Sequence, residues 1–288
     1  MIQARNKLSQ EELSEAKKLI NCCQAYDETY RDPYLSNMLN FDTNMPAFFL
    51  YYEKGELVGL LTVYADDPDV EVAILVHPNH RCQGIARALY RSFEKETASY
   101  PIESVTFQTE RIFLERHPDF ASNWGLVEDE ETETWLGKDR RPYPLANISN
   151  LEVLLADSSY QDQISQLKFQ AFSEEHESRE VVDRYVAKAL KDPESLLYIL
   201  LKNGQVIGTC TVDLSSNTNY LFGLAIAELE RGKGYGTYLA KSLINQLIEQ
   251  NDKAFQIAVE DSNLGAKRLY EKIGFVKQTQ VVYLKAKV

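Results

Sequence analysis

The stretch "ELERGKGYGTYLAKSL", residues 228–243, places three glycines within five positions, after an apolar run and before a segment with helical spacing. Because the first turn of a helix leaves backbone N–H groups unpaired, and the helix dipole adds positive potential there, such a start binds anions. Glycines allow a ligand to approach closely, and Arg231 and Lys233 add positive charge. We therefore predict a diphosphate site in this loop, with a ligand-free glycine turn as the alternative.

Two other phosphate-binding loops fit this stretch less well. A dinucleotide fingerprint counted from Gly232 requires a small residue where Thr237 stands, and it requires an acidic strand end about twenty residues later. A P-loop requires Lys-Ser or Lys-Thr directly after its last glycine, whereas Gly236 is followed directly by Thr237 and Tyr238. The loop is therefore not typical of the commonest nucleotide-binding folds.

The sequence repeats itself over its two halves. The runs "FFLYYEKGELVGLLTV" (48–63) and "LYILLKNGQVIGTCTV" (197–212) each flank a glycine turn that is typical of a β-hairpin. An apolar strand and a second copy of the loop follow in each half, so that Arg81 aligns with Arg231. Both halves are therefore predicted to share one fold.

Each half is predicted to be a mixed α/β domain. A helical segment comes first, then the hairpin, a third strand, the helix that the loop opens, and a further strand, helix and strand pair. The polar segment "GKDRRPYPLANISN" (137–150) separates the copies and is typical of a linker. We therefore predict an N-terminal domain over residues 1–145 and a C-terminal domain over residues 146–288.

The loop resembles the signature of the GNAT superfamily of acyl-CoA-dependent N-acetyltransferases, Arg/Gln-x-x-Gly-x-Gly/Ala after a strand. The second half has "RGKGYG" (231–236), and the first half has "RCQGIA" (81–86). The later family signature is matched by "VEDSNLGAKRLYEKIGF" (259–275). The resemblance covers both halves and implies a tandem GNAT protein of α/β (α+β) class. Each domain is then a mixed, mostly antiparallel sheet flanked by helices.

The resemblance also implies the site. In such enzymes the strand before the loop pairs with the pantetheine arm of acetyl-CoA, and the loop amides hold the pyrophosphate. An asparagine contacts the cofactor, and a tyrosine seven residues later lies near the thioester sulfur. The catalytic residues implied here are Tyr270 and the backbone N–H near Ile226, which stabilises the oxyanion, and no metal is implied. The cofactor-binding residues implied are Leu224, Ala225, Ile226, Arg231, Gly232, Lys233, Gly234, Tyr235, Gly236, Thr237 and Asn263 in the second half, and Ile74, Leu75, Val76, Arg81, Cys82, Gln83, Gly84, Ile85, Ala86 and Arg87 in the first.

Proton transfer is only half explained by these residues. A phenol with a pKa near 10 stays protonated at neutral pH and can donate to the departing thiolate, although Tyr270 is alternatively a packing residue. The attacking amine must lose a proton, and "NTNYLFGLAIA" (217–227) has no carboxylate. Tyr220, Asp213, or Glu228 through water, are the open candidates for the base.

The N-terminal copy departs from the pattern. The positions of Asn263 and Tyr270 fall on Leu114 and Ala121 there. We therefore interpret it as a degenerate copy that binds acetyl-CoA or only completes the architecture. Glu71, on the strand before its loop, is a candidate base, but we expect it to be a solvated carboxylate at the strand end.

Composition narrows the classes of partner. A net charge of −12 disfavours nucleic acid. No stretch resembles a signal peptide or membrane span, so we expect a cytoplasmic protein that does not bind membranes. The four cysteines have no metal-ligand spacing and are expected to be reduced.

These observations predict an acetyltransferase. We expect the C-terminal domain to transfer acetyl from acetyl-CoA to a primary amine by direct attack in a ternary complex. The acceptor is a small-molecule amine, or alternatively an amine of a peptide or protein, and the protein is a monomer or homodimer. The alternative function is a non-catalytic acyl-CoA sensor or interaction protein.

Overall fold

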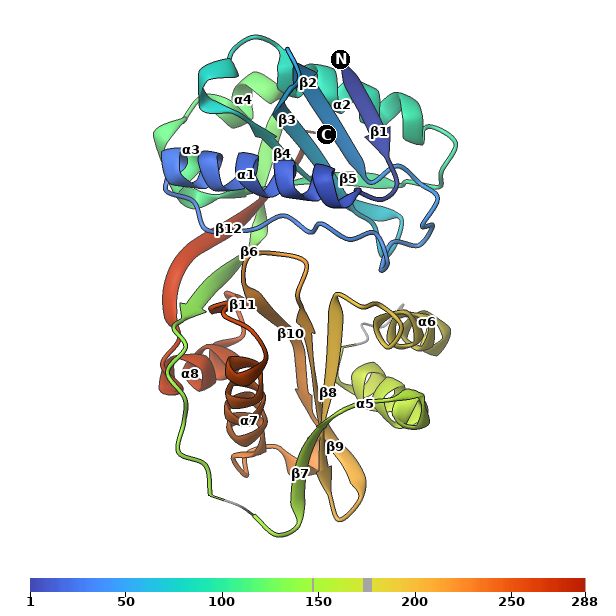
Figure 1. The fold of residues 1–288 in the computed structure, drawn as a ribbon, viewed down its shortest axis with the longest axis vertical. Helices are drawn as coiled ribbons and strands as arrows, with labels where there is room; N and C mark the ends of the chain where they lie inside the picture. The colour runs from blue at the N-terminus through green and yellow to red at the C-terminus, as the bar shows by residue number, and fades with distance from the viewer. Residues whose placement is uncertain (147, 173–177, 288) are drawn as a thin grey trace. The chain divides into compact units, whose positions relative to one another are not determined.

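The computed structural model describes residues 1–146, 148–172 and 178–287, and it divides into two compact units. The first unit comprises Met1–Trp135 and Gln278–Val288, and the second comprises Leu136–Lys277 (Figure 1). Each unit is described by itself below. No described helix is long and apolar enough to cross a membrane.

The first unit is an α/β sheet with helices on both faces. Its strands run in the order β1-β2-β3-β4-β5-β12, in which β4 and β5 are parallel and the pairs β1–β2, β2–β3, β3–β4 and β5–β12 are antiparallel. Its elements are β1 Ile2–Arg5, α1 Gln10–Asp27, β2 Phe48–Glu53, β3 Glu56–Tyr64, β4 Asp69–Val76, η1 Pro78–His80, α2 Ile85–Thr97, β5 Ser104–Glu110, α3 Arg111–Arg116, α4 Phe120–Trp124, β6 Leu126–Lys138 and β12 Val276–Ala286, of which β6 and β12 run across the unit boundary.

The second unit repeats this plan. Its strands run in the order β11-β10-β9-β8-β7, with β10 and β11 parallel and the remaining pairs antiparallel. Its elements are β7 Leu151–Leu155, η2 Ser158–Tyr160, α5 Gln161–Phe172, α6 Arg179–Ala189, β8 Ser195–Lys202, β9 Gln205–Asp213, β10 Asn219–Ile226, η3 Glu228–Glu230, α7 Tyr235–Gln250, β11 Phe255–Glu260 and α8 Leu264–Lys272. The mixed, mostly antiparallel α/β architecture predicted from the sequence is confirmed.

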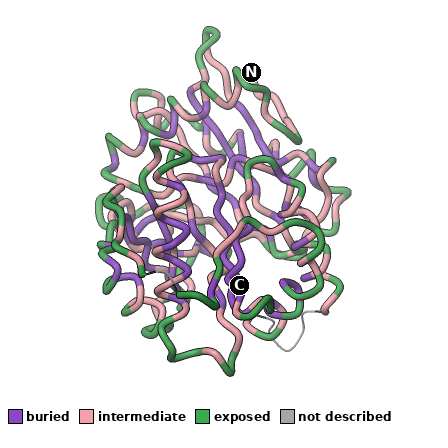
Figure 2. The backbone as a smooth tube through the Cα atoms, turned by 60° about the horizontal axis from the view of Figure 1, so that its bottom comes forward, coloured by how far each residue is buried: buried purple, intermediate pink, exposed green. Residues whose placement is uncertain are grey.

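Alternation along the strands builds a core on each face of the second sheet. On β8, Tyr198 and Leu200 join the cluster packed under α7, whereas Leu197 and Ile199 join the cluster under α5 and α6. The helices α7 and α8 accordingly cover one face of the strands, and α5 and α6 cover the other (Figure 1). Figure 2 marks the buried positions in purple, and the strands carry many of them.

The last strand lies in a different unit from the one that the sequence assigned. Residues 278–288 were expected in the C-terminal domain, but Val281–Lys285 pair antiparallel with Thr106–Glu110 of β5 in the first unit. This pairing covers a row of backbone groups that β5 would otherwise expose as an edge strand. The second compact unit therefore ends at Lys277.

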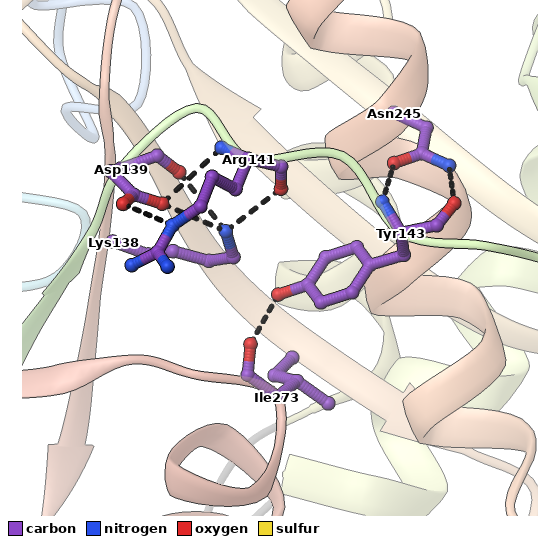
Figure 3. A network of polar contacts seen from close by, with 6 residues as sticks. All are labelled: Lys138, Asp139, Arg141, Tyr143, Asn245 and Ile273. Carbon is purple, nitrogen blue, oxygen red and sulfur yellow. Dashed lines mark hydrogen bonds and ion pairs between the residues drawn. The ribbon is translucent and has the colours of Figure 1, made fainter.

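The segment predicted as a linker is tied to the second unit. The Tyr143 backbone N–H donates to Asn245 Oδ1 at 2.9 Å, and Asn245 Nδ2 donates back to the Tyr143 carbonyl at 2.9 Å (Figure 3). The Tyr143 hydroxyl donates to the carbonyl of Ile273. Lys138 Nζ donates to the carbonyls of Asp139 and Arg141 at 3.1 and 3.0 Å. This part of the chain is therefore fixed by hydrogen bonds to α7 and to the end of α8.

Both sheets open where a parallel pair of strands ends. Among the described residues, β10 pairs with β11 only over Asn219–Leu221. In the first unit, β4 and β5 likewise pair only over Asp69–Val72. In addition, β10 has a bulge between Phe222 and Ala225, whereas the register of β4 with β3 is regular. Bulges are common beside active sites, so β10 is the more specialised strand.

Candidate active site

The glycine loop of the second unit is an open helix start. Gly232 and Gly234 have φ of +75° and +84°, and a Cβ at either position would meet nothing within 4 Å. Gly234 is the N-cap of α7 and has no side chain that could cap the helix. The first amides of α7 therefore face open space, which is the arrangement that binds a phosphate.

The third glycine of the loop has a different role. Gly236 lies inside α7, and a Cβ there would stand 3.1 Å from Leu269 Cδ1 of α8. Its missing side chain allows α8 to pack closely against α7. The helix that carries Tyr270 is therefore packed against the start of the helix that the glycine loop opens.

The charges beside the loop are partly balanced. Glu230 accepts hydrogen bonds from Lys202 and Lys233, each at 3.0 Å, and these two lysines lower its pKa. Arg231 Nε donates to the carbonyl of Ile226 at 3.0 Å, which fixes the loop to the end of β10. The side chains of this group sum to a net positive charge next to the open amides.

The backbone groups that the bulge frees lie upstream of the predicted oxyanion donor. Ile226 is in register with Gly208, and its carbonyl accepts from Arg231. The regular ladder with β9 is interrupted between Phe222 and Ala225, so the residues released from it are Gly223 and Leu224. The cofactor-binding stretch predicted from Leu224 to Ile226 thus begins inside the bulge.

The structure places Asn263 and Tyr270 on one helix. Asn263 is the N-cap of α8, and its Oδ1 accepts from the Ala266 N–H at 3.0 Å. Tyr270 is 6 % exposed, and burial raises the pKa of its phenol. Among the described residues its hydroxyl has no protein hydrogen-bond partner, although buried tyrosine hydroxyls usually find one. The hydroxyl is therefore available to a ligand.

The three candidate bases lie in different surroundings. Asp213 is buried, which raises its pKa to about 6, but it accepts hydrogen bonds from Ser215 N–H and Oγ at 3.0 and 2.9 Å. Tyr220 lies opposite Asp213 in the ladder and stacks on Phe222. Glu228 lies after the strand, in η3.

Sequence reasoning missed a buried lysine in the second unit. Lys168 of α5 is 5 % exposed, and burial lowers its pKa to about 8. Its Nζ donates to Thr211 Oγ1 of β9 at 3.3 Å. The signal was present, because Lys168 follows Ile164 by four residues and so shares the apolar face of the helix.

The first unit has a cavity of about 710 Å³ at its own opening between β4 and β5. Ile74, Leu75 and Val76 line it, as do the loop residues Arg81, Cys82, Gly84, Ile85, Ala86 and Arg87. Gln83 is the one predicted loop residue outside this lining, and its side chain donates to the Asn79 carbonyl at 3.5 Å. Nine of the ten residues predicted here therefore surround one space.

The arginine of this first loop is paired within the protein. Its Nη1 and Nη2 donate to both oxygens of the buried Asp27 at 2.7 and 2.6 Å, and its Nε donates to the Val76 carbonyl at 3.0 Å. The ring of Tyr26 lies 5.3 Å from the guanidinium carbon. The charge of Arg81 is therefore paired with Asp27, the last residue of α1, and an anion at this loop would meet its backbone groups and the Arg87 guanidinium.

The catalytic positions of the first unit differ from the second. Ala121 lies in α4, which also carries Phe120 and Trp124, and the ring of Phe120 packs against Phe113 of α3 and against Trp124. Glu71 is partly buried and accepts a hydrogen bond from Gln108. Burial raises the pKa of Glu71 to about 7, so the expectation of a solvated carboxylate is wrong.

Comparison with known proteins gives the family. The acetyltransferase (GNAT) family matches this chain twice, over residues 13–137 and 161–275. The chain belongs to the GNAT family of acetyltransferases. It is 25 % identical to the mycothiol acetyltransferase of Clavibacter sepedonicus over 230 aligned residues. The aligned region covers 76 % of this chain and 73 % of that protein.

Solved GNAT structures share the tandem fold. A GCN5-related N-acetyltransferase from Sphaerobacter thermophilus has a TM-score of 0.71 and 16 % identity, over 99 % of this chain and 94 % of the other. A tandem GNAT protein from the clavulanic acid biosynthesis pathway has a TM-score of 0.69 and 16 % identity, over 100 % and 99 %. At this identity the likeness establishes the fold alone.

Proposed function

We propose that the second unit transfers the acetyl group of acetyl-CoA to a primary amine by direct attack in a ternary complex. The observation that carries this proposal is Tyr270, whose side chain is buried and whose hydroxyl is protonated and has no hydrogen-bond partner among the residues that the structure describes. The contact of Leu269 with Gly236 holds its helix against the open phosphate loop. The anion site and the acid are thus parts of one rigid arrangement.

The residues fit the parts of acetyl-CoA in order along the site. The open amides at Gly232–Gly234, with Arg231 and Lys233, would hold the pyrophosphate. The edge of β10 that β11 leaves unpaired would bind the pantetheine amides. Bound acetyl-CoA supplies the activated acetyl group, and Tyr270 would protonate the thiolate as it leaves.

Acetyl-CoA is expected to raise the melting temperature of the second unit, and Gly234→Glu to abolish most of this increase. The substitution places a negative side chain at the open helix start, where it excludes and repels a phosphate. Gly204→Glu is the matched control, because Gly204 is also a left-handed turn glycine with open space above it. Protection that persists in a folded Gly234→Glu protein would contradict the assignment of this loop.

A second donor site in the first unit is favoured by its 710 Å³ cavity around the Gly84 loop. Calorimetric titration with acetyl-CoA is then expected to give two sites per chain. Gly84→Glu should remove one of them and leave turnover intact, whereas Gly55→Glu, at a left-handed hairpin glycine, should keep both. Loss of all activity in folded Gly84→Glu would show that the first unit is the catalytic one, with Glu71 as its candidate base.

The alternative function is an acyl-CoA sensor that binds the donor without turning over an amine. A screen of amines, aminoglycosides, amino acids and peptides, with detection of released thiol, separates the two functions. Binding without thiol release for any acceptor would favour the sensor. Thiol release that requires one class of acceptor would establish the transferase and identify that class.

A further inference from the structure

Deprotonation of the acceptor is the step for which the predicted residues provide no group. An amine with an ordinary pKa near 10 is neutral in about one molecule in 10³ at pH 7, so a base speeds its attack. The register of the two sheets places Tyr220 where the first unit has Glu71, because they pair with Asp213 and Tyr64 respectively. The Asp213 carboxylate already accepts two hydrogen bonds from Ser215. The second unit therefore needs a base from another element.

Lys168 touches β10 at its bulge. Its Nζ lies so close to Gly223 that a Cβ on this glycine would stand 2.7 Å from it. Gly223 has a φ of +58° and lies within the interruption between Phe222 and Ala225. Because Gly223 has no side chain, there is room for Lys168 Nζ at this point. It is also the point at which β10 interrupts its regular pairing with β9.

The Lys168 side chain and the Tyr270 phenol lie on opposite faces of the sheet. Lys168 bonds to Thr211, whereas the adjacent Cys210 points to the other face and belongs to the cluster that contains Tyr270. In Figure 1, α5 accordingly lies on one side of β9 and β10, and α7 and α8 on the other. A base on one face and an acid on the other can serve an amine and a thiolate on opposite sides of the same carbonyl carbon.

The surroundings of Lys168 permit both charge states. The rings of Phe172 and Tyr185 lie 5.9 and 5.6 Å from Nζ and stabilise the ammonium form. Within the described residues, no ion pair joins Nζ to a carboxylate, so burial favours the neutral amine. The other titratable groups on the elements packed against α5 include Cys210 and Asp213 of β9, Tyr220 of β10, and Asp183, Arg184, Tyr185 and Lys188 of α6. Of these, Cys210 raises the pKa of Lys168.

We propose that Lys168 is the general base of the second unit, an inference that rests on the acetyl transfer proposed above. Its neutral Nζ takes a proton from the acceptor ammonium, and the freed amine attacks the thioester carbonyl carbon. As the C–N bond forms and the C–S bond breaks, Tyr270 protonates the thiolate. Lys168 releases its first proton to water and takes the second proton of the new amide nitrogen, which it also releases, while the Tyr270 phenolate recovers a proton from water. The net products are amide, CoA thiol and one proton.

The base is tested with three substitutions of Lys168 in the full-length chain. Lys168→Met should lower kcat/KM at pH 7 by 10²- to 10⁴-fold, the range of general base catalysis. Lys168→Arg should be equally slow, because its guanidinium stays protonated. Trimethylamine, which accepts a proton but cannot be converted to a neutral amide, should partly restore Lys168→Ala. Lys138→Met, at another buried lysine of this unit, is the matched control and should keep the wild-type rate.

Binding measurements separate this inference from the proposed function. Calorimetry should show unchanged acetyl-CoA affinity in Lys168→Met, and the wild-type pH profile of kcat/KM should rise through a pKa that this variant lacks. A wild-type rate in Lys168→Arg, failure of trimethylamine to restore any activity, or lost acetyl-CoA binding in Lys168→Met would each overturn the base alone. Absence of thiol release by the wild type with every amine would instead overturn the transferase function.

Discussion

Tyr270→Phe is expected to lower kcat by roughly 10²-fold or more while changing acetyl-CoA affinity little, because it deletes only the proton donor. Burial raises the pKa of this phenol, so it remains protonated at every pH at which the enzyme works. The ring itself packs beside Phe275 at 6.1 Å and is retained in the variant. Rate and affinity should therefore separate, and stopped assays of thiol release together with calorimetry measure the two quantities.

Tyr198→Phe provides the control for this result. Tyr198 is another buried tyrosine of the same cluster, but its hydroxyl has a protein partner, Gln250, at 3.2 Å. We expect this variant to lose some stability and no activity. If Tyr270→Phe turns over at the wild-type rate with several acceptors, Tyr270 is a packing residue and water supplies the proton. A parallel loss of rate and affinity would instead indicate that the helix has shifted.

The fold was predictable because local patterns and tertiary contacts agree in both halves. Glycine turns at Gly55 and Gly204, alternating apolar strands and the loop at a helix start each dictate one conformation. The placement of the last strand in the first unit was not predictable. The segments 123–136 and 272–284 resemble each other, so the hydrophobic pattern suits either sheet and does not specify which edge a strand covers.

The geometry of the glycine loop was predictable because it depends on local backbone conformation. Gly232 and Gly234 stand in open space as an anion site requires, whereas Gly236 serves helix packing, a contact from a distant segment that no local motif reveals. The proposed role of Lys168 was not predictable for the same reason. That role depends on its contact with Gly223, which is distant in sequence and becomes its neighbour only when α5 packs on β10.

Lys168→Met is also expected to stabilise the second unit at pH 7, by up to about 3 kcal/mol. Burial lowers the pKa of Lys168 from 10.5 to about 8, and each unit of such a shift corresponds to about 1.4 kcal/mol. Below pH 8 both folded and unfolded chains carry the charge, so the folded state bears the whole cost of burying it. Between about pH 8 and 10.5 the folded chain has released a proton that the unfolded chain keeps, so the free energy of unfolding of the wild type rises with pH.

The advantage of Lys168→Met should therefore shrink as the pH rises from 8 toward 10.5. Both tryptophans, Trp124 and Trp135, lie in the first unit, so their fluorescence does not report this change. Hydrogen exchange of the buried α7 amides between Leu239 and Leu247 follows the second unit instead. A variant that is more stable and yet slower would identify a residue kept for chemistry at the expense of stability, which a packing lysine would not be. If Lys168→Met is instead less stable than the wild type at pH 7, the lysine is a structural group whose bond to Thr211 the fold requires.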